Sequence, residues 1–189
     1  MRKIIESTNN YIFDTDCLST FFHANCEGIL LKVFKKLIVP KKVYDELCQY
    51  IGKDNKPKYK GRFDSLKFSK QIVIHNFEIG SEEWNIFFEM TNKSQMKGIK
   101  VIGQGEAACI AYSVLYNGII CSNNLTDIMF YVEKYKLKYI TTADIFCYIC
   151  DKNIMGKFEI EKCWDTIKKY SKLPTEYFID YYEKYKNEN

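Results

Sequence analysis

Residues 119–153 read IICSNNLTDIMFYVEKYKLKYITTADIFCYICDKN, and this stretch decides the fold class. Ile119 to Ser122 is a short apolar run typical of a buried strand, and the apolar spacing of Leu125 to Tyr135 predicts a helix. The pattern then repeats, with a strand expected at Tyr139 to Thr141 and a helix at Ala143 to Asn153. Short links between alternating strands and helices favour a parallel sheet, because parallel neighbours need a crossover. The sequence therefore predicts an α/β fold with a central, mainly parallel sheet.

The same alternation is expected upstream, in one domain that spans residues 1–189. Strands are predicted at Tyr11 to Phe13, Leu37 to Val39 and Gln71 to Phe77. Helices are predicted at Leu18 to Phe22, Ile29 to Lys36, Pro40 to about Gly52, Glu82 to Met90 and Ala107 to Tyr116. Lys53 to Arg62, with five basic side chains, Pro57 and Gly61, is expected to be a surface loop.

The tail, about residues 157–189, predicts a helical extension packed on this domain. Glu159 to Tyr185 indicates two helices, broken at Leu173-Pro174, with apolar side chains at helical spacing. A segment of this length cannot bury an independent core, so it should pack on the domain or on a partner.

Composition and the lengths of apolar segments limit the cellular compartment that we expect for this protein. No apolar stretch approaches the roughly 20 residues that span a bilayer, and Met1 to Asn10 lacks the apolar core of a signal peptide. We therefore expect a cytoplasmic protein without a membrane partner. The eight cysteines, including the Cys147 and Cys150 pair, mostly lie in apolar segments and are expected to be buried free thiols. A net charge of +4 is a mild excess that favours no partner by itself.

Acidic side chains follow the predicted strands. Asp14 and Asp16 come directly after the first strand, and the turn from Ser122 to Asp127 follows a later one. Ligands of open parallel sheets collect beyond the carboxyl ends of the strands, and Glu106 begins a helix at that edge. Carboxylates gathered there repel one another unless a cation neutralises them, and Mg²⁺ or Mn²⁺ prefers such oxygen ligands. A metal held in this way activates water toward a phosphodiester.

Four segments resemble the motifs of PIN-domain nucleases, in the family's order. Phe13-Asp14-Thr15-Asp16-Cys17-Leu18 resembles the opening motif, and Val39-Pro40 to Asp45-Glu46-Leu47 looks like the second. Gly103-Gln104-Gly105-Glu106-Ala107-Ala108 is similar to the third. Cys121-Ser122-Asn123-Asn124 departs from the fourth, because Asn124 stands where the family usually has an acid. The resemblance covers about residues 10–172, and the added C-terminal helices look like those of some VapC-type toxins.

The resemblance implies a PIN-like three-layer sandwich and assigns roles to single residues. It implies catalytic positions at Asp14, Glu46, Glu106 and Asn124. It implies metal ligands at Asp14 and Glu106, with Asp127 compensating for the amide of Asn124, and supporting positions at Thr15, Asp16 and Ser122. For Glu46 the alternative is a salt bridge with Lys42, and for Glu106 it is a helix N-terminus carboxylate.

Three functions follow, from different classes. The first is an endoribonuclease that uses Mg²⁺ or Mn²⁺, of the toxin kind that an antitoxin protein restrains. The second is a PIN-like module that has lost catalysis and binds RNA or a protein, which Asn124 favours. The third is a nucleotide-binding protein that uses Gly103-Gln104-Gly105 at a helix start. A homodimer is compatible with each of these.

A basic segment offers a candidate RNA contact. Lys58, Lys60 and Arg62 could meet phosphates while Tyr59 and Phe63 stack on bases. The alternative interpretation is a solvated charged loop without a ligand.

Overall fold

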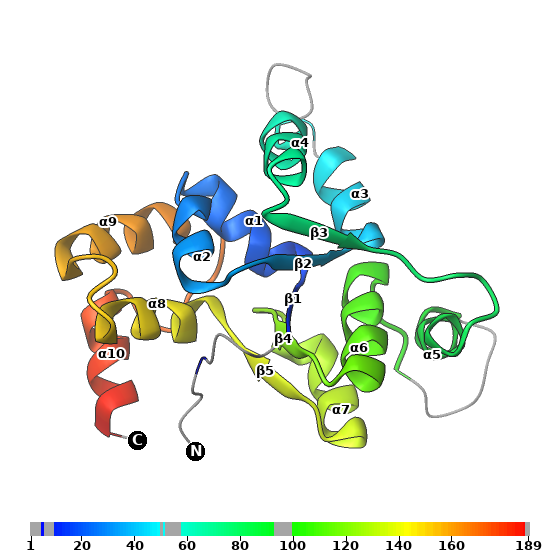
Figure 1. Ribbon diagram of the computed structural model, residues 1–189. Coiled ribbons are helices and arrows are strands. Elements are labelled where there is room, and N and C mark those ends of the chain that lie inside the picture. The colour runs from blue at the N-terminus through cyan, green and yellow to red at the C-terminus, as the bar shows by residue number, and fades with distance from the viewer. Residues whose placement is uncertain (1–4, 6–9, 50, 52–57, 93–99, 188–189) are drawn as a thin grey trace.

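A five-stranded parallel sheet runs through the middle of the molecule in the computed structural model, which describes residues 5, 10–49, 51, 58–92 and 100–187 (Figure 1). Its strand order is β3-β2-β1-β4-β5, and each neighbouring pair is parallel. The strands of this described sheet are β1 (Tyr11–Phe13), β2 (Leu37–Pro40), β3 (Ile72–His75), β4 (Ile119–Cys121) and β5 (Lys138–Ile140). The predicted parallel α/β fold is confirmed.

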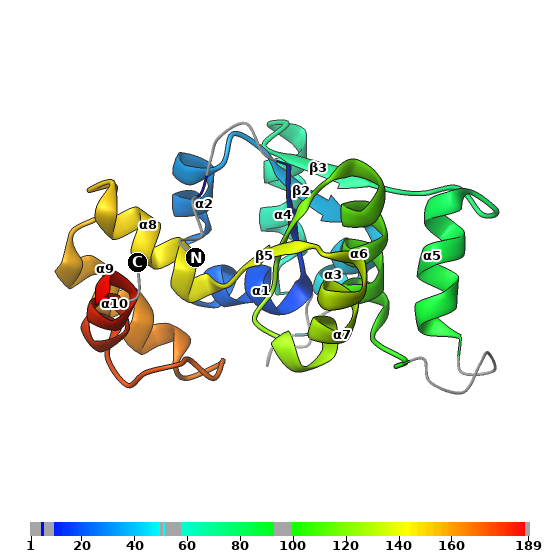
Figure 2. The ribbon, with the colours of Figure 1, turned by 90° about the horizontal axis from the view of Figure 1, so that it is seen from below.

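Helices connect and cover these strands on both sides of the sheet, as the two ribbon views show (Figures 1 and 2). The described helices are α1 (Thr15–His23), α2 (Glu27–Val33), α3 (Lys41–Gln49), α4 (Lys60–Phe68), α5 (Glu82–Thr91), α6 (Gln104–Tyr116), α7 (Leu125–Tyr135), α8 (Thr142–Asp151), α9 (Lys157–Ile167) and α10 (Phe178–Asn187). Even the longest of them, α6 with 13 residues, is too short to cross a membrane, and none of the described helices meets that requirement.

The central strand β1 is buried along its whole length, which explains its continuous apolar sequence. Ile12 lies beside Ile38 of β2 and Ile120 of β4, and its side chain is inaccessible to solvent. Strands of a parallel sheet are covered on both faces, so they need apolar side chains at successive positions instead of alternate ones. The polar residues of this region are therefore confined to the strand ends.

The C-terminal extension packs on α8 and α1 through aromatic side chains. Trp164 of α9 and Phe178 of α10 are buried, with ring centres 5.5 Å apart, and both lie against Phe146 of α8. Thr20 of α1 and Ser171, which follows α9, share a hydrogen bond of 3.1 Å. The extension thus completes the apolar core beside α8.

The prediction that residues 53–62 form one surface loop is wrong at its end. Helix α4 already begins at Lys60, and Tyr59 and Phe63 are fully buried, with the Phe63 ring stacked on Phe22. Burial of these two aromatic side chains draws this end of the segment onto the core. Lys53, Lys56 and Pro57 lie outside the described residues, as does the predicted end of the preceding helix near Gly52.

The prediction of free thiols is confirmed, and that of burial is confirmed for six of the eight. All eight cysteines are unpaired, and six of them are buried, including Cys147 and Cys150. Burial raises the pKa of the Cys147 thiol above its ordinary value, so it is kept protonated. The C-x-x-C segment is therefore part of the α8 core.

Candidate active site

Asp14 stands at the carboxyl end of the central strand, where it joins three elements. Its backbone N–H donates to the carbonyl of Cys121 at 3.0 Å, which extends the pairing of β1 with β4 by one residue. Its carboxylate accepts the N–H of Thr15 at 2.7 Å, at the start of α1, and the hydroxyl of Ser122 at 2.9 Å. Only 1% of Asp14 is exposed. The acid is thus held in a fixed place at the predicted edge of the sheet.

Asp16 ties the turn after β4 to the first turn of α1. Its two carboxylate oxygens accept the backbone N–H of Asn123 at 3.2 and 3.0 Å, and the hydroxyl of Ser122 lies 3.4 Å from one of them. The two strand ends that the sequence suggested would meet therefore do meet, and Ser122 contacts both acids.

The pKa values of Asp14 and Asp16 are raised at this edge of the sheet. Burial is the largest cause that lifts the pKa of Asp14 well above its ordinary value, followed by the negative charges of Asp16 and Glu106. Burial likewise raises the pKa of Asp16, and the charge of Glu106 adds to it. These shifts mean that the three carboxylates lie close enough to repel, which is the condition under which a cation stabilises such a site.

Glu46 reaches the same cluster from α3. Its carboxylate accepts a short hydrogen bond from the hydroxyl of Thr15, while Lys42, its alternative partner, lies over the ring of Phe87. A Cβ atom on Gly105 would lie 3.1 Å from the Glu46 carboxylate, 3.1 Å from the Thr15 hydroxyl and 3.2 Å from Asp14 Oδ1. The start of α6 therefore approaches the acids so closely that only a glycine fits without displacing them.

Asn124 uses its amide nitrogen to join two carboxylates. This nitrogen donates to Glu106 at 3.1 Å and to Asp127 at 2.7 Å. Asp127 also pairs with the ammonium of Lys100 at 3.0 Å, and the bond from Asn124, followed by that from Lys100, lowers the pKa of Asp127. The amide thus acts as a neutral donor between acids, and Asp127 is engaged by both Asn124 and Lys100.

The carboxylate of Glu106 fills the space beside the N-terminus of its own helix, α6. A Cβ atom on Gly103, the residue before the helix, would collide with the carboxylate of Glu106. A negative group in that space repels a phosphate, so the geometry does not favour the nucleotide-binding hypothesis for Gly103 to Gly105.

The donor set has the chemistry of a magnesium or manganese site, since it consists of carboxylate and amide oxygens. The acids nevertheless all have protein hydrogen-bond donors in this structure. Across the described ranges, no group of three or more His, Cys, Asp or Glu side chains is arranged as a ready set of metal ligands. The predicted roles of Asp14, Glu106 and Asp127 as ligands therefore stay predictions.

Of the basic residues proposed to contact RNA, Lys60 and Arg62 lie on α4, and Lys58 lies in the bend just before it. Arg62 donates from Nε to Glu27 of α2 at 2.7 Å and also bonds to Asn25 at 3.1 Å, so its guanidinium joins two segments. Lys60 pairs with Asp64 at 2.6 Å, and Lys58 lies over the ring of Tyr170.

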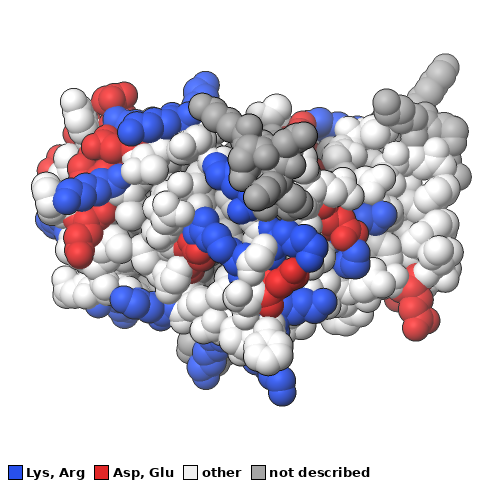
Figure 3. Space-filling view, turned by 90° about the horizontal axis from the view of Figure 1, so that it is seen from above, with Lys and Arg blue, Asp and Glu red and all other residues white. Residues whose placement is uncertain are grey.

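The face around α4 carries many Lys and Arg side chains with acids among them (Figure 3). Stacking of bases on Tyr59 and Phe63 is excluded in this conformation, because both rings are buried. Contact of RNA with the charged groups stays a prediction.

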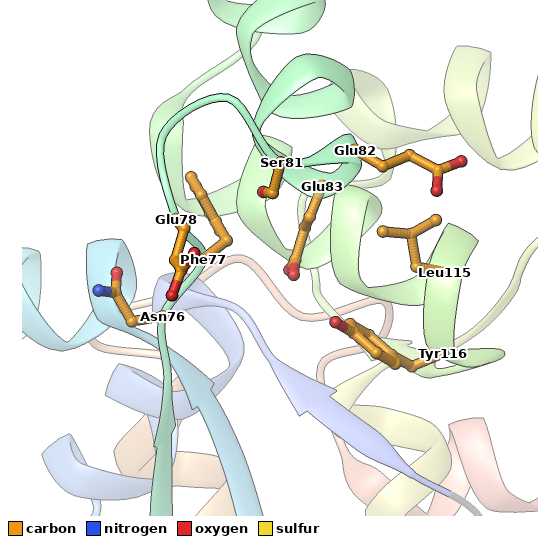
Figure 4. A pocket seen from close by; sticks show the side chains of 8 residues that line it. All are labelled: Asn76, Phe77, Glu78, Ser81, Glu82, Glu83, Leu115 and Tyr116. Carbon is orange, nitrogen blue, oxygen red and sulfur yellow. The ribbon is translucent and has the colours of Figure 1, made fainter.

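A separate hollow of about 360 Å³ lies between the end of β3, the start of α5 and the end of α6. Glu83 and Tyr116 point into it (Figure 4), and Glu83 accepts a hydrogen bond from the ring of His75 at 2.8 Å. The contact between His75 and the buried Glu83 could not be predicted from local patterns, since the two residues belong to different elements. No predicted site residue lines this hollow.

Comparison with known proteins gives a likeness of structure alone. No protein-family model matches the chain, and no curated protein matches it. A solved structure that it resembles is that of VapBC-1 from nontypeable Haemophilus influenzae, with 13% sequence identity and a TM-score of 0.49. The matched region covers 70% of this chain and 97% of that chain. The observed architecture is a sandwich of a parallel sheet between helices.

Proposed function

We propose that this protein is a metal-dependent endoribonuclease that hydrolyses RNA with Mg²⁺ or Mn²⁺, and that it is the toxin of a toxin–antitoxin pair. The observation that carries the proposal is the gathering of three acids around one turn of the chain. The Ser122 hydroxyl lies 2.9 Å from Asp14 and 3.4 Å from Asp16, and the amide of Asn124 donates to Glu106 at 3.1 Å. Repelling carboxylates at the carboxyl edge of a sheet are costly unless they bind a cation. The order of the four motifs that resemble PIN domains supports the same function.

Each acid has a proposed role that its position allows. Asp14, which is fixed by Thr15 and Ser122, is the central ligand, and Glu106 is the second. Glu46 orients the attacking water, with its carboxylate steadied by the Thr15 hydroxyl. A bound Mg²⁺ or Mn²⁺ would supply an activated water and would stabilise charge on the leaving oxygen.

The test is cleavage of a labelled single-stranded RNA with and without Mn²⁺. We expect cleavage by the unaltered protein, its loss in Asp14→Asn, and its reduction in Glu46→Gln. Asp45→Asn is the matched control, because Asp45 is the neighbour of Glu46 on α3 and pairs at the surface with Lys41. Equal cleavage by Asp14→Asn and the unaltered protein would remove the proposal, since the activity would then come from a contaminant.

The toxin assignment has its own test in living bacteria. Induced production of the unaltered protein should arrest growth, whereas Asp14→Asn produced at the same level should not. Growth arrest by both proteins alike would show that toxicity does not come from this cluster.

A second candidate function is an RNA- or protein-binding module without catalysis. Asn124 favours it, because it supplies no negative charge and its amide nitrogen already occupies Glu106 and Asp127 by donating a hydrogen bond to each. Calorimetry with Mn²⁺ separates the candidates, since the module should release little or no heat and the nuclease should bind the cation.

Asn124→Asp should raise Mn²⁺ affinity, because it adds a carboxylate where an amide stands. An unchanged affinity would instead mean that Asp127 is the ligand on this side of the cluster.

A further inference from the structure

A cleft of about 310 Å³ opens on the carboxyl edge of the sheet, beside the acid cluster. Its inner wall is made by the two turns that follow β4 and β5, through Asn123, Leu125, Thr141 and Ala143. Its outer wall comes from the C-terminal extension, through the segment 172–174 and Tyr181 of α10. The extension therefore closes a space that the five-stranded sheet alone would leave open.

The cleft and the acids share one turn of the chain. The backbone N–H of Asn123 donates to Asp16, while its side chain lines the cleft. That side chain is fixed, because it accepts the N–H of Thr142 at 2.9 Å and donates to the Thr142 hydroxyl at 3.0 Å. A group bound in the cleft would thus contact the residue that precedes Asn124 in the chain and that holds Asp16.

The walls suit a flat group with apolar faces and a polar rim. Leu125, Ala143, Leu173 and Pro174 give the cleft more apolar than polar surface, and the Asn123 amide and the Thr141 hydroxyl add polar groups. Tyr181 adds an aromatic ring, whose hydroxyl lies 3.4 Å from Asp144 at the start of α8. Pockets for small ligands range from about 300 to 1,000 Å³, so a cleft of this volume takes one small ring system.

The charge at the cleft favours a nucleic acid over an apolar peptide. Lys172 is exposed and belongs to the lining, so its ammonium can meet a phosphate beside the bound ring. Bases of single-stranded RNA commonly stack on aromatic side chains while lysines contact the backbone.

We infer that this cleft binds one unpaired base of the RNA substrate, next to the phosphodiester that is cut, with Tyr181 against the base and Lys172 at a phosphate. The inference rests on the proposed function for the identity of the substrate. It gives the C-terminal extension a role in substrate recognition.

The experiment measures binding of a short fluorescent single-stranded RNA in EDTA, where cleavage is suppressed. Tyr181→Ala should weaken binding at least about 5-fold, because loss of one base–aromatic contact typically costs about 1–3 kcal/mol. Tyr177→Ala is the matched control, since Tyr177 is an exposed tyrosine of the same extension outside the cleft and should bind as the unaltered chain does. Tyr181→Phe, which keeps the ring, should also bind normally.

Two further readouts locate the RNA. Lys172→Ala should lower the slope of log affinity against log salt concentration by about 0.7, as expected for one lost contact to single-stranded phosphate, and Lys169→Ala should leave it unchanged. RNA that carries 4-thiouridine should cross-link to the segment 172–181. Equal affinity of Tyr181→Ala and Tyr177→Ala, cross-links confined to other segments, or no RNA binding by the unaltered chain would each overturn the inference.

Failure of this inference is distinguishable from failure of the proposed function. A chain that binds RNA through Tyr181 but cleaves none with Mn²⁺ would refute the nuclease and leave the base-binding cleft in place. If the unaltered chain cleaves RNA and Tyr181→Ala binds RNA normally, the nuclease proposal stands and the base-binding cleft is refuted.

Discussion

At the scale of single residues, the acids and the nearby Thr15, Ser122 and Asn124 could be predicted from the sequence, but the hydrogen bonds between distant elements could not. Asp14 and Asp16 follow a buried strand directly, so their position at the sheet edge is a consequence of local order along the chain. The bond from Thr15 to Glu46 depends on how α1 and α3 are placed relative to each other, which no local pattern encodes. The closeness of Gly105 to three of these oxygens was missed for the same reason.

Gly105 should be intolerant of any side chain. In Gly105→Ala, the added methyl would press on Glu46, Thr15 and Asp14 at 3.1 to 3.2 Å, so we expect weaker Mn²⁺ binding by calorimetry and slower RNA cleavage. Gly61→Ala on α4 is the matched control, because nothing lies within 4 Å of its new methyl group.

The two alanine variants should also differ in stability. The free energy of unfolding should rise in Gly61→Ala by about 0.5–1 kcal/mol, the usual gain for alanine in a helix. Gly105→Ala should gain less, since the new methyl is crowded. Normal cation affinity in Gly105→Ala would show that the cluster has more room than the distances indicate.

The raised pKa of Asp14 makes a prediction about stability and pH in the absence of divalent cations. Because the folded state binds this proton more tightly than the unfolded chain, the contribution of Asp14 to stability is complete below the ordinary value of 3.8 and is lost as pH rises through the raised pKa. Asp14→Asn should therefore unfold at higher urea concentration than the unaltered protein at neutral pH, and the difference should shrink as pH falls. The comparison is made in EDTA, with Asp45→Asn as the baseline.

The sign of that difference is the decisive readout. A lower stability of Asp14→Asn at neutral pH would mean that ionised Asp14 is favourably placed without a cation. The argument that a cation is needed to relieve repulsion between these carboxylates would then fail.

At the scale of elements, the strands and most helices followed from the apolar pattern, because the central strands are buried along their length and each helix buries one stripe in the core. The start of α4 did not follow, since Pro57 and Gly61 indicated a loop and the partners of Tyr59 and Phe63 lie far away in sequence. Burial against Phe22 outweighs the local turn signals there. Arg62, which looked available in a loop, is thereby part of the contact between α4 and α2.

Substitution of Arg62 should lower the free energy of unfolding, whether or not Arg62 contacts a ligand. Arg62→Ala leaves the mostly buried carboxylate of Glu27 without its cation, so we expect a loss of about 1–3 kcal/mol in urea unfolding, below the value for a fully buried pair. Lys60→Ala is the matched control, since its pair with Asp64 is exposed on the same helix and should change stability by less than about 0.5 kcal/mol. Equal effects of the two variants would show that the Arg62 to Glu27 pair does not fasten α4 to α2.

At the scale of the whole molecule, the C-terminal extension was predicted to pack on the domain because it is too short for a core of its own. Its aromatic side chains do so unequally. Trp164 and Ile167 are fully buried, whereas Tyr170 and Tyr177 are more than half exposed. Helical spacing alone could not separate these sets, because Tyr170 and Tyr177 lie outside the helices α9 and α10.

Trp164 should be essential for the stability of the entire chain. Trp164→Ala empties a fully buried site against Phe146 and Phe178, so we expect a loss of about 3–5 kcal/mol in the free energy of unfolding. Phe158→Ala on the same helix is the control, since its ring is 72% exposed and its removal should cost about 0.5 kcal/mol or less. Circular dichroism during urea titration provides the measurement, and a small loss in Trp164→Ala would show that the extension is only loosely attached.

The protein hydrogen bonds that hold Asp14, Asp16, Glu46 and Glu106 have a consequence for how the molecule would respond to chelators. The four side chains reach their positions through Thr15, Ser122, Asn123 and Asn124, so folding itself assembles the pocket of acids. Removal of divalent ions by a chelator should therefore abolish the proposed RNA cleavage without unfolding the protein. Activity should return as soon as the ions are restored, with no refolding delay.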